Sequence, residues 1–89
     1  MNRDQIAQLR AIATGERPRV HFHRLRFYAR GWVRVTGQRG QHGRVVVSVA
    51  LSAEAYREIG VDRPFPDEER EIILVSDEVE VAVGDAIGA

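Results

Sequence analysis

The stretch RLRFYARGWVRV, residues 24–35, decides how the chain is interpreted, because two kinds of side chain alternate along it. Side chains of a β-strand point to opposite faces with a period of two. The alternation predicts one long strand with an apolar odd face and an even face of arginines and aromatic rings. That even face carries Arg24, Arg26, Tyr28, Arg30, Trp32 and Arg34.

The following segment predicts a hairpin. Residues 37–43, GQRGQHG, are rich in turn-forming glycine, and residues 44–51, RVVVSVAL, place apolar side chains on every odd position. A turn centred on Gly40 pairs Val35 with Val45 and brings the apolar faces of both strands together. We therefore expect a hairpin with one core face and one face of arginines and aromatics.

Two helices are predicted from their end signals. Asn2 with Gln5 forms a capping-box pattern, and apolar residues then recur at helical spacing up to Gly15. Ser52 is placed to cap a second, short helix, which Gly60 ends in a Schellman-type turn.

The C-terminal third predicts a loop and a second hairpin. Prolines on both sides of Phe65 exclude a helix there, and we expect Phe65 to plug an edge of the core. EIILV at 71–75 and VEVAV at 79–83 have the composition of two paired strands. Together these elements predict an α+β fold in the order α-β-β-α-β-β, with a four-stranded antiparallel sheet and two short helices. A chain of 89 residues is expected to form a single domain, 1–89.

Charge is divided unevenly along the chain although the formal net charge is zero. Residues 1–51 contain ten arginines and two carboxylates, a net charge of +8. Residues 52–89 contain three arginines and eleven carboxylates, a net charge of −8. Such asymmetry indicates a polyanionic partner, or two halves that neutralise each other.

These features favour a small non-enzymatic protein that binds DNA or RNA. Arginines would neutralise phosphates while Tyr28 and Trp32 stack on bases. The predicted binding residues are Arg24, Arg26, Tyr28, Arg30, Trp32, Arg34, Arg39, His42 and Arg44. Because Arg, Tyr and Trp also anchor protein interfaces, the alternative is a protein-interaction module, self-associating or inhibitory, that uses the basic and acidic halves. A third interpretation is purely structural, with arginine stems covering the aromatic rings and pairing with the acidic half.

Catalysis, metal binding and a cofactor are not expected. The chain has no cysteine and no lysine, and its few Ser and Thr residues lack a His-Asp setting. The predicted hairpin places His42 far from His21 and His23, so the three histidines do not make one metal site. No signal-peptide or membrane-spanning pattern is present, which predicts a cytoplasmic protein without membrane contact.

Overall fold

One of the two inner strands of the sheet comes from the C-terminal part of the chain. In the computed structural model, which describes residues 1–75, a four-stranded sheet has the order β1-β4-β3-β2. β4 pairs in parallel with β1 on one side and antiparallel with β3 on the other. The described elements are α1 (Arg3–Ala13), β1 (Arg19–His21), α2 (Phe22–Tyr28), β2 (Val33–Gln41), β3 (Arg44–Leu51), α3 (Ala53–Ile59) and β4 (Arg70–Val75).

Residues 1–75 thus form a small α+β domain with a mixed sheet and three helices, and the predicted fold class is confirmed only at that level. The observed order, α-β-α-β-β-α-β, corrects the expected α-β-β-α-β-β order and the all-antiparallel sheet. β4 uses both of its edges within the sheet, to β1 and to β3. The predicted hairpin partner of residues 71–75, residues 79–83, lies outside the described residues.

Both predicted helices with clear end signals are confirmed. At α1, the Asn2 side chain accepts from the Gln5 amide while the Gln5 side chain accepts from the Asn2 amide, each at 2.9 Å. At α3, the Ser52 hydroxyl accepts from the Ala55 amide, and Gly60 ends the helix at φ 70°. Glycine adopts this left-handed conformation without steric cost, as the sequence predicted.

The long strand predicted over residues 24–35 is wrong in its first half. Residues 22–28 form the helix α2, whose buried side chains are Leu25 and Tyr28. These two side chains are three residues apart, so a helix turns both toward the core, whereas a strand would separate them. After α2 the chain turns through Gly31, which has a φ of 141°. The strand β2 begins only at Val33.

The hairpin is present, but its predicted register is wrong. The turn consists of His42 and Gly43, both at positive φ, as a two-residue type I′ turn requires. Val35 therefore lies opposite Val49, in place of the predicted Val45. A bulge between Val35 and Gly37 adds a second change, because the extra residue reverses the facing of every later side chain of β2.

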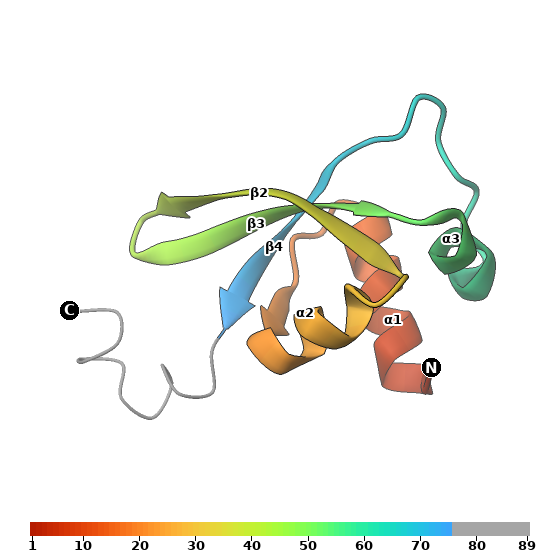
Figure 1. Ribbon diagram of the computed structural model, residues 1–89, viewed down its shortest axis with the longest axis horizontal. Helices are drawn as coiled ribbons and strands as arrows, with labels where there is room; N and C mark the ends of the chain where they lie inside the picture. Colours follow the sequence, from red (N-terminus) through yellow and green to blue (C-terminus); the bar gives the residue numbers. More distant parts are fainter. Residues whose placement is uncertain (76–89) are drawn as a thin grey trace.

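All three helices lie on one side of the sheet (Figure 1). The core forms between them and the sheet, from α1, α2 and α3 side chains and from inward-facing residues such as Val20, Val47, Val49 and Ile72. Arg10 ties α1 to α3 because its Nε donates to the Ile59 carbonyl at 2.8 Å. Phe65, expected to plug the core, is 99% exposed on the loop before β4, which corrects that prediction.

Candidate functional site

The face of the sheet turned away from the helices carries a concentration of arginines. Val47, Val49 and Ile72 point to the helices, so their alternate neighbours in each strand point the other way. We call the second side the open face. By register it holds Arg19, Arg34, Arg39, Gln41, Arg44, Val46, Ser48, Ala50, Glu71 and Ile73.

The β2 bulge brings Arg39 onto this face. Before the bulge Arg34 pairs with Ala50, and after it Arg39 pairs with Val46. In a regular strand, Arg34 and Arg39 would point to opposite faces, because five residues separate them. The extra residue at the bulge shifts the alternation by one, so both side chains point to the same face. Arg34 and Arg39 therefore share the open face with Arg44 of β3.

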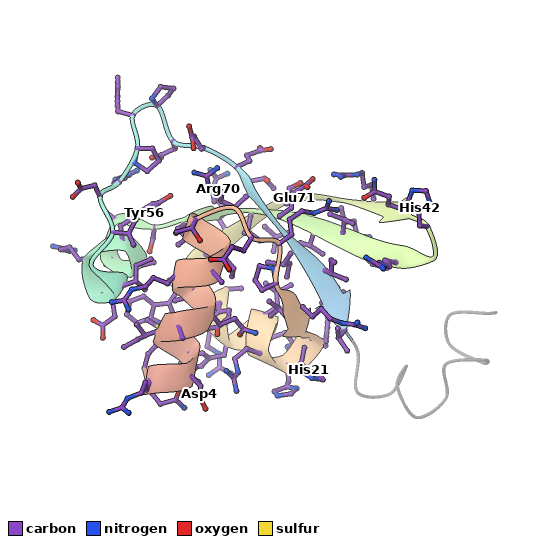
Figure 2. The ribbon with its side chains drawn as sticks, turned by 180° about the vertical axis from the view of Figure 1, so that it is seen from behind. Asp4, His21, His42, Tyr56, Arg70 and Glu71 are labelled. Atoms are coloured by element: carbon purple, nitrogen blue, oxygen red, sulfur yellow. The ribbon has the colours of Figure 1, made fainter. Side chains whose placement is uncertain are left out.

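Within residues 1–75, Glu71 of β4 (Figure 2) is the one carboxylate that the register places on this face. The Arg39 guanidinium donates to Glu71, and Arg17 Nε lies 3.4 Å from the other carboxylate oxygen. Arg17 also donates to Gln41 Oε1 at 3.0 Å. The hydrogen bond from Arg39, helped by the charges of Arg39 and Arg17, lowers the pKa of Glu71 below its ordinary value of 4.5.

Counting Arg17, the register of residues 1–75 gives the open face five arginines and one carboxylate, a charge of +4, with Asp67 of the following loop near Arg34. Within residues 1–75, neither Arg19, Arg34 nor Arg44 forms an ion pair, and all three are exposed. Arg34 also lines a shallow pocket with Ala50, next to the base of the loop that carries Phe65. The open face therefore offers solvated guanidinium groups suited to phosphate or carboxylate oxygens.

The predicted site residues divide into two groups. Arg34, Arg39 and Arg44 share the open face, with Arg39 and Arg44 near the hairpin tip and Arg34 toward the other end of the hairpin, opposite Ala50. His42 lies at the tip itself (Figure 2). The remaining predicted residues lie on or just after α2, outside this face: Arg24, Arg26, Tyr28, Arg30 and Trp32.

The aromatic part of the predicted site is corrected by burial. Tyr28 is fully buried, and its hydroxyl donates to Gln8, so its ring is not available to stack on a base. Burial is the main cause of its raised pKa, which Arg24 partly offsets. Trp32 is half-buried against the core, in contrast to its expected place opposite Ser48, whose partner is Gly37.

Two open-face residues were missed from the sequence. Arg19 carried a usable signal, because Val20 is the apolar residue of a short alternating stretch and its neighbours must face the other way. Arg17 carried none: it has φ 54° in the loop before Pro18, and only the folded chain brings it to Glu71. Among residues 1–75 no three potential metal-ligating side chains cluster.

The described helices include none of the length and apolarity that crossing a membrane requires. Comparison with protein-family models, with curated proteins and with solved structures finds no match to this chain.

Proposed function

We propose that this protein binds single- or double-stranded nucleic acid through the open face of its sheet, without catalysis. The observation that supports the proposal is that, among the described residues, one sheet face carries five exposed arginines and one carboxylate. Phosphates are the ligands, and Arg19 and Arg44 contact them first because neither forms an ion pair within residues 1–75. Arg34 shares a pocket with Asp67 and helps to lower the pKa of that carboxylate.

Binding on this face is mainly electrostatic. With Tyr28 buried and Trp32 packed on the core, the arginine strands supply no aromatic platform for bases. Phosphate contacts position a nucleic acid but carry no sequence information. We therefore expect weak discrimination between sequences and a steep loss of affinity as salt concentration rises.

Fluorescence anisotropy with labelled 20-nucleotide DNA and RNA, single- and double-stranded, tests the proposal at low salt. The double variant Arg34→Ala/Arg44→Ala removes two open-face contacts, so the slope of log K against log salt should fall in magnitude by about 1.4 to 1.8. The matched control is Arg26→Ala, which removes an arginine of α2. Absence of binding at micromolar protein, or equal effects of both variants, would refute it.

A second candidate function, recognition of an acidic protein segment, is favoured by Glu71. Its carboxylate is held by Arg17 and Arg39, so the open face already accommodates one carboxylate of the chain itself. The anisotropy experiment distinguishes the two functions if a labelled acidic peptide of equal charge is included. Preference for the peptide over every oligonucleotide at the same salt concentration would replace the first proposal with the second.

A further inference from the structure

The loop between α3 and β4 presents one aromatic side chain to solvent. Phe65 is 99% exposed, so its ring packs against almost nothing within residues 1–75. A proline on each side restricts the backbone at this position. Beneath the tip, Arg63 Nε and Nη2 donate to the two carboxylate oxygens of Asp67, each at 2.8 Å. This bidentate pair joins the two sides of the loop and leaves the ring at its tip.

The base of this loop adjoins the open face of the sheet. Arg34 and Ala50 are partners across β2 and β3, and they line one shallow pocket together with Arg63 and Asp67. The pKa of Asp67 is lowered chiefly by its hydrogen bond with Arg63, and the charge of Arg34 contributes. Figure 1 shows the loop rising on the side of the sheet that faces away from the helices. The loop that carries Phe65 therefore borders the open face at the end where Arg34 lies.

The charge of the loop limits which part of a nucleic acid it can meet. Residues 60–69 contain four carboxylates and one arginine, a net charge of −3. Carboxylates repel phosphate groups, so the loop favours an uncharged, planar group over the backbone. The arginines of the open face have the opposite preference. Both preferences are met by a strand whose phosphates lie on the arginines and whose base reaches Phe65.

We propose that Phe65 stacks on an unpaired base of the nucleic acid whose phosphates the open face binds. The inference rests on the proposed function and narrows it to single-stranded nucleic acid. Bases inside a duplex are stacked on their neighbours, whereas the bases of a single strand can be splayed out onto an aromatic side chain. Every base has a π face, so this contact keeps the weak discrimination between sequences that is expected of the arginines.

The first test removes the ring. Phe65→Ala should melt like the wild type, because the side chain contacts almost nothing within the described residues. It should bind a labelled 20-nucleotide single-stranded DNA at least about fivefold more weakly, because one base loses its stacking partner. The slope of log K against log salt should not change, since every arginine is retained. The matched control Phe22→Ala, at a half-exposed ring on α2, should leave the affinity unchanged.

The second test removes the bases. A 20-nucleotide strand of sugar and phosphate without bases retains the backbone charges, so the wild type and Phe65→Ala should bind it with equal affinity. The two proteins should also bind a duplex equally, because its bases are already stacked. Phe65→Trp keeps an aromatic platform and should bind the normal strand at least as tightly as the wild type. Phe65→Leu keeps only apolar character and should behave like Phe65→Ala.

The outcomes distinguish failure of this inference from failure of the proposed function. The stacking contact is overturned if the wild type and Phe65→Ala bind the normal strand equally while Arg34→Ala/Arg44→Ala still reduces the salt slope. In that case the open face remains a phosphate-binding surface. An equal loss of affinity for the strand without bases would also overturn stacking, because the ring would then act without a base. Absence of any nucleic-acid binding by the wild type would overturn both proposals.

Discussion

Val46 and Val47 are neighbours in β3 that are equally buried on opposite sides of one sheet. Val46 is 1% exposed and Val47 is 2% exposed. Val47 belongs to the core beneath the helices, whereas Val46 lies on the open face opposite Arg39. Long arginine side chains cover apolar surface with their methylene stems while the guanidinium remains in water.

The comparison shows that equal burial has two different physical origins in this protein. On the helix side, residues from all seven described elements enclose an apolar volume that excludes charge. On the open face, Val46 has Arg39 and Ile73 as its cross-strand partners, and an arginine stem can cover an apolar side chain while its guanidinium stays in water and rearranges around a substitution. The open face should therefore tolerate changes that the helix side does not.

The largest expected effect comes from placing a carboxylate on each side. Val47→Asp buries an unpaired charge under the helices and should cost about 3 to 5 kcal/mol in free energy of unfolding. Val46→Asp places the same group opposite Arg39 and should cost clearly less, because the new carboxylate finds a guanidinium partner. Thermal and urea unfolding followed by circular dichroism give both values. Equal losses would show that the open face is as closed as the core.

A smaller effect is expected at Tyr28, a fully buried core residue whose hydroxyl has a hydrogen-bond partner. Tyr28→Phe removes the hydrogen bond to Gln8 and should cost about 1 kcal/mol. Nucleic-acid affinity should not change, because the ring lies beneath the helices. A loss of affinity at unchanged stability would return Tyr28 to the binding site. Leu25→Ala, on the same helix, controls for general weakening of α2.

The smallest expected effect on stability is at Glu71. Its folded pKa is lowered by Arg39, so its stabilising contribution is present above about pH 4.5 and is lost as pH falls through the folded pKa. Glu71→Gln should lower the free energy of unfolding slightly at neutral pH and leave it nearly unchanged at low pH, which flattens the acid limb of the stability profile. The same variant frees Arg17 and Arg39 and should strengthen binding to a phosphate backbone. Unchanged binding would place the nucleic acid away from this pair.

Local signals predicted the parts of the fold whose causes are local. The Asn2 and Ser52 caps and the left-handed Gly60 each involve groups within four residues, and all three are observed. The facing of Val47 and Val49 toward the core was also predictable, because it follows from the alternation within β3 itself and does not depend on the register with β2.

Longer-range causes explain the errors. The sequence of α2 fits the period of a strand as well as that of a helix. Burial of Leu25 and Tyr28 against other elements favours the helix. The site was predicted only in part for a related reason. Arg34 and Arg44 follow from alternation, but Arg39 joins them through a bulge and Arg17 through a loop, and no pattern in the sequence marks either event.

The position of β4 inside the sheet also determines when the fold can be completed. Residues 19–21 and 70–75 are distant in sequence, and pairing them requires a large loop to close first. During synthesis, α1, the β2–β3 hairpin and α3 leave the ribosome before the strand that joins β1 to β3 exists. Until then, one edge of β3 has unsatisfied backbone groups and a row of valines beside it. Assembly of the domain is therefore a late event governed by residues 70–75, and pulsed hydrogen exchange during refolding should find the β4 amides among the last to gain protection.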